Sequence, residues 1–331
     1  MDPVTHGLIG ASTSQSFVSN EQLRPAAIIG IVSAMLADLD VFIFDSADPL
    51  LNIELHRQFS HSFIFIPVGA LIASGLLWYF FRNKMSFRKI YGLSFLGYAT
   101  AGITDTFTSY GTKLFWPFSE SRFSWDLISV FDPLFSLVIL VIVILALYKK
   151  NPKICWFAWG WIVLYLSFAV IQQHRGTSVA KIIAQKQNHQ MKKLVVKPTL
   201  GNQLLWSIRY EAQDTLYANG VHLSLFNDPK VYQGEAAPLL NWQQKYEQLN
   251  GTTLYNDIKR FDNLSEGYLI EHPDKSNVIG DGRYAMLPTA MSPLWGIKVD
   301  TTKPHKHLPF KTFRDATPAV RNTYLDMLLR Q

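Results

Sequence analysis

The chain has 331 residues, of which 48% are hydrophobic and only 17% are charged, whereas about 25% are charged in an average soluble protein. This composition argues against a wholly soluble globular protein, and the 14% of aromatic residues exclude a disordered chain. The single cysteine excludes a disulfide scaffold and an all-cysteine zinc site. The net charge of +6 predicts no nucleic-acid partner, because the basic residues mostly lie in short turns between apolar runs.

Six apolar stretches follow one another in the first part of the chain and are candidate membrane helices: 4–17, 25–44, 62–81, 90–104, 127–148 and 154–173. Stretches 62–81, 127–148 and 154–173 have the roughly 20 residues that a helix needs to cross a bilayer. The others are weaker, and 4–17 fits a half-span or an interfacial helix. A buried helix of a soluble core is the alternative for each weak stretch. We predict a helical, polytopic membrane domain of five to six membrane helices over residues 1–173.

Lysines and arginines gather in the short loops 82–89 and 149–153, which predicts that both loops are cytoplasmic. Alternation of the spans then places the chain from His174 onward outside the cytoplasm. The start Met1-Asp2-Pro3 lacks the basic region of a signal peptide, so we expect the first apolar stretch to stay in the mature chain. The predicted protein is therefore a multi-pass protein of the lipid bilayer.

The composition changes after residue 173. A polar helical stretch is predicted over 176–193, and strand-like runs follow at 204–210, 215–226, 267–271 and 283–299. Turn-forming pairs such as Asn219-Gly220 and Asp281-Gly282 punctuate this region. We predict that residues 174–331 form a small extracytoplasmic, soluble α+β domain with an antiparallel sheet.

Ionisable residues recur at those ends of the predicted spans that face outward: His6, Asp38, Asp40, His56, His61, Asp105, Asp126 and Asp132. Such residues are costly in a membrane and are usually functional. Imidazole nitrogens and carboxylate oxygens are the usual ligands of zinc, and carboxylate-rich sets suit manganese or magnesium. The sequence therefore predicts a divalent-metal site at the outer membrane face.

The spacing of these residues limits their roles. His56 and His61 are about 140° apart on a helix, so we expect a loop, with Ser60 as the N-cap of the next helix, to turn both into one pocket. Asp38 and Asp40 cannot share a helical face, so one is expected to be a ligand and the other its supporting partner. The alternative for Asp132, which precedes Pro133, is a helix cap. The alternative for His6 is that it has no functional role.

Six motifs occur in an order that is typical of one family: Met1–Gly7, Ala37–Asp40, His56–Ser62, Asp105–Thr112, Trp116–Phe118 and Phe131–Leu134. They resemble the YdjM-like family of bacterial inner-membrane metal-dependent hydrolases, strongly over residues 1–175. The tail resembles it more loosely, through Leu205–Ser207 and 281–297. The resemblance implies metal-assisted hydrolysis in the bacterial inner membrane without defining a substrate. The chain departs from the family at Ala101, because the family typically has a histidine there, one helical turn before the aspartate.

Our leading hypothesis is a membrane-bound, metal-dependent hydrolase. Its ligands for zinc, with manganese or magnesium as alternatives, would be His6, His56, His61, Asp105 and one of Asp38 and Asp40. The other aspartate is a candidate general base. Arg57 and Arg122 are candidates to hold an anionic group, with a headgroup-facing arginine as the alternative, and a site at headgroup level favours a lipid or phosphoester substrate.

The alternative hypothesis is a catalytically degenerate, metal-stabilised membrane scaffold that binds a partner, which Ala101 favours. A transporter is a third class. It is less favoured, because the ionisable residues gather at one membrane face instead of forming a path through the bilayer.

Overall fold

The computed structural model describes residues 1–314 and 316–329, and these form two units. The first unit comprises Met1–Ile43, Leu55–Ile171 and Leu200–Asn202. The second comprises Phe44–Glu54, Gln172–Thr199 and the chain from Gln203 onward. The segment Phe44–Glu54 thus belongs to the second unit, although both segments that flank it in the sequence belong to the first.

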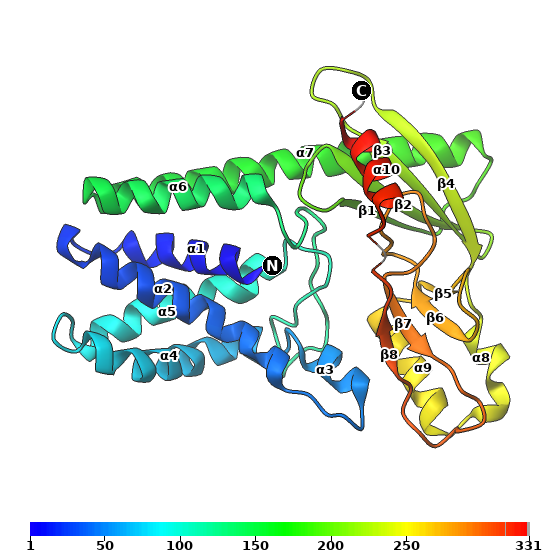
Figure 1. The fold of residues 1–331 in the computed structure, drawn as a ribbon, viewed down its shortest axis with the longest axis horizontal. Coiled ribbons are helices and arrows are strands. Elements are labelled where there is room, and N and C mark those ends of the chain that lie inside the picture. The colour runs from blue at the N-terminus through cyan, green and yellow to red at the C-terminus, as the bar shows by residue number, and fades with distance from the viewer. Residues whose placement is uncertain (315, 330–331) are drawn as a thin grey trace. The chain divides into compact units, whose positions relative to one another are not determined.

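The first unit is helical, and its longer helices are labelled in Figure 1: α1 (Pro3–Gln15), α2 (Leu23–Leu36), α4 (Ile66–Phe81), α5 (Phe87–Asp105), α6 (Pro133–Lys149) and the start of α7 (Trp156–Lys186). Five 3₁₀ turns connect them or extend their ends: η1 (Asn20–Gln22), η2 (Ala37–Phe42), η3 (Phe59–His61), η4 (Phe63–Phe65) and η5 (Pro152–Cys155). Three stretches have the length and apolar composition of a membrane span: Asn20–Phe42, Phe63–Phe81 and Pro152–Lys186. The helical membrane domain is thus confirmed, and the larger number of spans stays a prediction.

Helix α6 begins later than the sequence predicted. The expected span 127–148 is a helix only from Pro133, and its 17 residues make it shorter than the other spans. The reason is a local start signal: the Asp132 carboxylate accepts a hydrogen bond from the Phe135 backbone N–H at 3.2 Å, and Pro133 occupies the first helical position. The structural alternative for Asp132 is therefore correct.

Helices α1 and α2 pack against each other through their backbones (Figure 1). A Cβ atom at Gly10 would lie 2.4 Å from the Gly30 carbonyl oxygen, and one at Gly30 would lie 2.1 Å from that of Gly10. Small residues at such crossings allow membrane helices to approach closely. The contact matters for the site because His6 lies on α1 and Asp38 follows α2.

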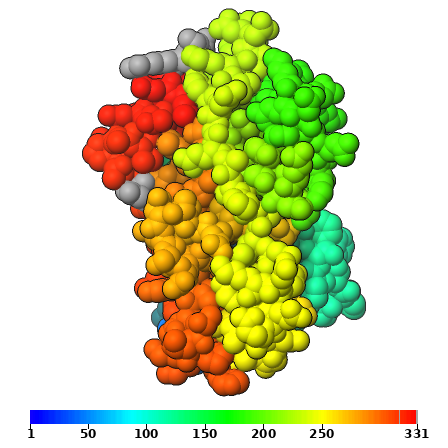
Figure 2. Space-filling model, turned by 90° about the vertical axis from the view of Figure 1, so that its right-hand side faces the viewer, coloured from blue at the N-terminus to red at the C-terminus, as the bar shows by residue number. Residues whose placement is uncertain are grey.

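The second unit contains two four-stranded antiparallel sheets. The first has the order β1 (Lys193–Pro198), β2 (Leu205–Ala212), β3 (Thr215–His222) and β4 (Lys230–Pro238). The second has the order β5 (Leu269–Glu271), β6 (Val278–Asp281), β7 (Trp295–Lys298) and β8 (Phe310–Thr312). The helices of this unit are α3 (Pro49–Leu55), whose last residue lies in the first unit, α8 (Trp242–Lys245), α9 (Thr253–Leu264) and α10 (Pro318–Leu329), with a 3₁₀ turn η6 (Glu247–Leu249). Figure 2 views the molecule onto this unit, with β4 in yellow-green, α8 and α9 in yellow and the chain of β5 to β8 in orange.

The antiparallel arrangement is confirmed, but two of the predicted segments differ. The polar helix expected over 176–193 is the continuation of α7, which ends at Lys186, and β1 begins at Lys193. Of the strand expected over 283–299 only β7 forms. Pro288 and Pro293 lie in the part that is not a strand, and proline cannot donate a hydrogen bond to a neighbouring strand.

The second sheet packs with α9 around a core to which α3 contributes. Leu254, Ile258 and Phe261 of α9 are buried and recur with the helical spacing of one face. Leu50 of α3 is fully buried in the same cluster. A residue from the segment between two parts of the membrane unit therefore completes the core of the second unit.

Candidate metal centre

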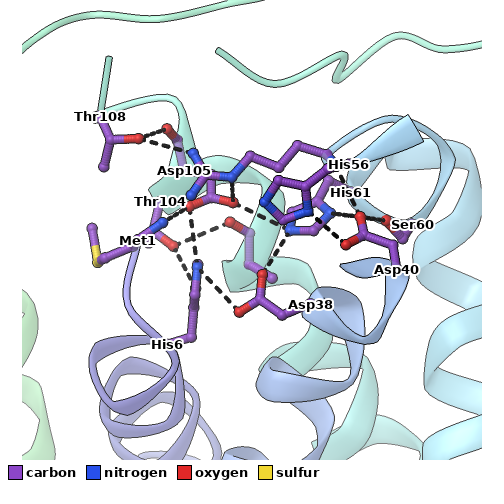
Figure 3. Close-up of polar contacts among 12 residues, drawn as sticks. Met1, His6, Asp38, Asp40, His56, Ser60, His61, Thr104, Asp105 and Thr108 are labelled. Atoms are coloured by element: carbon purple, nitrogen blue, oxygen red, sulfur yellow. Dashed lines mark hydrogen bonds and ion pairs between the residues drawn. The ribbon is translucent and has the colours of Figure 1, made fainter. Parts of the chain in front are cut away.

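The structure brings the six predicted ligand residues together within the first unit (Figure 3). Four elements or their ends supply them: α1, η2, the turn that leads from α3 into η3, and the last residue of α5. In chain order these residues are His6, Asp38, Asp40, His56, His61 and Asp105. Residues that are about 100 positions apart in the sequence thus form one cluster.

Four of the six residues face a common point. His6 Nε2 lies 3.1 Å from Asp105 Oδ1 and 3.9 Å from Asp38 Oδ2. His61 Nε2 lies 3.2 Å from Asp105 Oδ2 and 3.3 Å from Asp38 Oδ1. The side chains of His6, His61 and Asp105 are fully buried, whereas that of Asp38 is 17% exposed. Solvent therefore reaches this inner group from the side of Asp38.

Asp40 and His56 form an outer layer. Asp40 Oδ1 lies 2.7 Å from His56 Nδ1, and Oδ2 accepts hydrogen bonds from the Arg57 backbone N–H at 2.9 Å and the Ser60 hydroxyl at 2.6 Å. Asp40 Oδ2 also lies 3.3 Å from His61 Nδ1. Asp40 therefore holds the loop and the back of the His61 ring, while Asp38 faces the inner group.

The loop around His61 is shaped by local backbone geometry. Arg57 has a φ of 59°, a left-handed conformation that costs a non-glycine residue roughly 1–2 kcal/mol. Its backbone N–H bonds to Asp40, and its carbonyl accepts from Lys113 N–H at 3.0 Å. Ser60 lies inside the 3₁₀ turn η3 and is not a helix N-cap as predicted, because its hydroxyl bonds to Asp40 instead of a backbone N–H.

Gly102 allows α5 to approach the His61 backbone. A Cβ atom at this position would lie 2.2 Å from the His61 carbonyl oxygen. Sequence reasoning did not single out Gly102. The available signal was a glycine within a helical stretch, close to the predicted ligand Asp105.

The hydrogen-bond network fixes which ring nitrogens carry protons. The Ser60 hydroxyl donates to Asp40, so at 2.9 Å His61 Nδ1 must be the donor to the Ser60 oxygen. The Thr104 hydroxyl donates to the Thr100 carbonyl, so at 3.2 Å His6 Nδ1 must be the donor to the Thr104 oxygen. In the neutral rings, both Nε2 lone pairs therefore point toward carboxylates, an arrangement that requires a positive charge between them.

Several buried atoms of the inner group have no hydrogen-bond partner among the described residues: Asp38 Oδ2, His61 Nε2 and Asp105 Oδ2. All three are metal-ligand atoms. Such buried atoms are costly when unsatisfied. The residues present therefore fit a divalent cation.

The cluster contains positive groups as well. Arg57 Nε lies 3.0 Å from Asp105 Oδ2, its Nη1 donates to the Thr108 hydroxyl at 3.0 Å, and the Met1 α-amino group pairs with Asp105 Oδ1. These two cations and a protonated His61 balance the three aspartates, and a bound metal would take the place of the proton on His61. Burial alone would lower the pKa of His61, but its neighbours Asp105, Asp38 and Asp40 raise that pKa to about 10.

The two arginines predicted to hold an anion, Arg57 and Arg122, differ in burial and in their hydrogen-bond partners. The Arg57 guanidinium is buried and directed at Asp105 and Thr108, not at solvent. Arg122 is half-buried and donates to the carbonyl oxygens of His56 at 3.4 Å and Gly111 at 3.3 Å. Arg57 is therefore part of the ligand cluster, and Arg122 holds the backbone around it.

Ala101 is fully buried one turn before Asp105, in an apolar cluster with Ala37 and Tyr98. Its methyl group supplies no ligand. The inner group described above consists of His6, Asp38, His61 and Asp105, without a contribution from position 101.

A second group of possible ligands lies in the second unit and was not predicted. Asp48, Asp257 and His307 have ligand atoms within 4.8 Å of one another. Here the Arg260 guanidinium pairs with Asp48 at 2.9 Å and with Asp257 at 2.9 Å. An internal cation therefore already neutralises this second group.

Comparison with known proteins identifies one family. The family model described as YdjM inner membrane protein matches residues 1–176, which is more than half of the 331-residue chain. No curated protein and no solved structure matches the chain. The matched range includes every residue of the candidate metal centre and ends before β1.

Proposed function

The chain belongs to the YdjM inner membrane protein family, and from this membership and the geometry of the site we propose that it is a metal-dependent hydrolase of the bacterial inner membrane. The observation that carries the proposal is the convergence of buried ligand atoms that make no well-directed hydrogen bond, although Asp105 Oδ2 lies 3.0 Å from Arg57 Nε and 3.2 Å from His61 Nε2. The three ligand atoms are Asp38 Oδ2, His61 Nε2 and Asp105 Oδ2. Together with His6 Nε2, they offer the mixed nitrogen and oxygen set that suits zinc, with manganese or magnesium as alternatives.

The ligand roles follow from the directions of the side chains. His6, Asp38, His61 and Asp105 would hold the ion, because their ligand atoms face one another. Asp40 would keep His61 in the orientation that presents Nε2, through the Nδ1 side of the ring. His56 pairs with Asp40 and is a ligand only if its ring turns away from that carboxylate.

A bound divalent ion supplies Lewis-acid activation of water and of the bond to be broken. The chain's own groups would handle protons and charge. Asp38 would act as the general base only through the carboxylate oxygen that does not hold the ion, and it is favoured over Asp40 because it is partly exposed, whereas Asp40 is buried and already accepts several hydrogen bonds. Arg57, directed into the cluster, would stabilise negative charge that develops on a substrate.

The substrate class that we propose is a lipid or another phosphoester at headgroup level. With the basic loops 82–89 and 149–153 in the cytoplasm, the site lies at the outer face and the chain from His174 onward is extracytoplasmic. Exposed tyrosine and tryptophan residues occur near the site in the chain of the first unit, where Tyr110 and Trp125 are 40% and 51% exposed. Aromatic side chains of this kind are enriched at the membrane–water interface, which supports a membrane-borne substrate.

The alternative function is a catalytically degenerate scaffold that the metal stabilises. Ala101 favours it, because the position that resembles a family ligand carries only a buried methyl group. The two proposals share the metal and differ in turnover, so one series of measurements separates them.

The first experiment measures metal content by elemental analysis of detergent-purified protein that carries a histidine-free affinity tag. We expect about one equivalent of a divalent metal in the wild type, and its loss in His61→Ala. The matched control is His305→Ala, which changes an exposed histidine of the second unit and should leave the metal content unchanged.

Turnover is then measured on phosphodiester and phospholipid substrates with metal-loaded protein. Activity that is present in the wild type and lost in His61→Ala supports the hydrolase. A stoichiometric metal whose removal unfolds the protein, without activity on any of these substrates, favours the scaffold. Metal-free protein from cells grown with all three metals would contradict both.

A further inference from the structure

The segment Phe44–Glu54 joins two halves of the metal centre in the sequence. Asp40 lies four residues before this segment, and His56 lies two residues after it. The segment itself belongs to the second unit, while both flanking residues belong to the first. Whatever holds this segment therefore acts on the chain that leads to the site.

An apolar side chain anchors the segment. Leu50 is fully buried in the core of the second unit, in a cluster with Trp242, Leu254 and Ile258, and Ile53 packs against the same cluster. Helix α3 has only seven residues, a length at which a helix is not stable by its own hydrogen bonds. The order of α3 therefore depends on this packing.

An ionic network holds both ends of α3. Arg260 Nε and Nη2 donate to the two Glu54 oxygens at 2.9 and 2.6 Å, and its Nη1 donates to Asp48 Oδ1 at 3.0 Å. Asp257, which is buried, pairs with Arg260 at 2.9 Å and with His307 Nδ1 at 3.0 Å. Two-point pairing of a guanidinium with a carboxylate fixes orientation as well as distance. Asp48, Leu50 and Glu54 are called the α3 anchor below.

Helix α3 continues into the site without a spacer. It ends at Leu55, whose carbonyl accepts a hydrogen bond from Gln58 N–H at 3.1 Å. Between these residues lie His56 and Arg57, and Arg57 takes the left-handed conformation that reverses the chain. Helix α3 and the turn that carries His56 and Arg57 are therefore continuous in the chain.

We propose that the second unit positions the metal centre through the α3 anchor, so that Leu50 and Glu54 are positioning residues for a site that they do not touch. The inference rests on the proposed metal-dependent function. The proposal predicts a coupling between the two regions. When α3 is released, the turn 55–62 becomes more mobile, and His61 and Arg57 spend less time in the orientation that faces the cation.

The test uses the full chain in lipid nanodiscs and two variants of the anchor, Leu50→Ala and Glu54→Gln. The matched control for the first is Leu216→Ala, because Leu216 is equally buried in the second unit but lies on β3, in a core cluster that does not contain Leu50. Hydrogen–deuterium exchange is followed in peptides that cover 44–54 and 55–62. Zinc affinity is measured by competition with a chelator. If Leu50→Ala fails to fold, the Glu54→Gln variant still tests the proposal.

We expect both anchor variants to exchange faster in 44–54 and 55–62, and to bind zinc about tenfold more weakly, the lower end of the effect of residues that orient metal ligands. Leu216→Ala should leave 55–62 and the zinc affinity at wild-type values. Faster exchange confined to 44–54, with unchanged zinc affinity, would overturn the coupling. If the wild type binds no zinc, manganese or magnesium, the proposed function fails. In that case the hydrogen–deuterium exchange of peptide 55–62 in the anchor variants still shows whether α3 orders the turn. An exchange rate equal to that of the wild type would overturn the inference.

Discussion

The two units contain clusters of the same residue types in opposite states. In the first unit, Asp38, His61 and Asp105 leave buried ligand atoms without hydrogen-bond partners. In the second unit, Asp48, Asp257 and His307 surround the Arg260 guanidinium, which pairs with both carboxylates. Two aspartates and a histidine within reach of each other therefore do not define a metal site. We expect the deciding feature to be whether the chain's own cations reach all the carboxylates: the Arg260 guanidinium pairs with both in the second group, whereas the Arg57 guanidinium and the Met1 amino group pair only with Asp105 in the first.

The largest loss of metal affinity is expected on substitution of Asp105, which is the fully buried carboxylate of the first cluster. The Asp105→Asn variant removes a buried charge that faces both His6 and His61, so metal affinity should fall by more than about 100-fold, beyond the loss caused by residues that only orient ligands. Isothermal titration with zinc measures the change. The matched control is Asp132→Asn, at the N-cap of α6, which should keep the metal and nearly all of the stability, because asparagine caps helices about as well as aspartate. Retained affinity in Asp105→Asn would remove this residue from the ligand set.

A smaller effect is expected at Asp40, which supports the ligands without facing them. Asp40→Asn weakens acceptance from the Ser60 hydroxyl and the Arg57 N–H, so zinc should bind roughly 10–100-fold more weakly. Asp45→Asn, at an exposed aspartate, is the control and should titrate as the wild type does. A loss in Asp40→Asn as great as that in Asp105→Asn would make Asp40 a direct ligand.

The close approach of α5 to the His61 backbone gives a third test. In Gly102→Ala the new methyl group meets the His61 carbonyl, so the loop must shift and zinc affinity should fall by about tenfold or less. Gly92→Ala lies on the same helix, where a Cβ atom meets nothing within 4 Å, and should raise helix stability by up to about 1 kcal/mol without a change in affinity. Equal affinities in the two variants would show that the loop adapts.

The smallest effect is expected when the internal cation of the second cluster is removed, which should give that cluster a weak affinity for a metal ion. Arg260→Ala removes the internal cation from Asp48, Glu54 and Asp257, so one additional manganese ion should bind weakly. Arg260→Lys keeps the charge and should bind none at this cluster. Electron paramagnetic resonance counts the bound manganese. A variant without the additional ion would mean that geometry, and not charge alone, closes the cluster.

The residues that cluster in the candidate site could be picked out from the sequence, because carboxylates and histidines stand out against apolar stretches, and the basic loops predict a common orientation for these stretches. Their roles were not. Asp38 and Asp40 differ in direction because the chain tightens into the 3₁₀ turn η2 after α2, and nothing in the sequence marks that change.

The second unit was less predictable, for reasons that depend on distant residues. Strand β4 is exposed along most of its length and lacks the alternation of a half-buried strand. The docking of α3 depends on Arg260, which lies 206 positions from Glu54. A local pattern contains no information on such a partner, so the segment 44–54 resembled an ordinary loop between two membrane helices.

The backbone contact between Gly10 and Gly30 has a consequence for ion selectivity. His6 lies one helical turn before Gly10 on α1, and Asp38 follows the end of the helix that carries Gly30. Since each glycine would place a Cβ atom against the carbonyl of the other, the two helices are at their closest possible separation. In the proposed site, that separation sets the gap that an ion must fill between His6 and Asp38. Ionic radius would then be discriminated at two residues without side chains, one of them a single helical turn from the ligand His6.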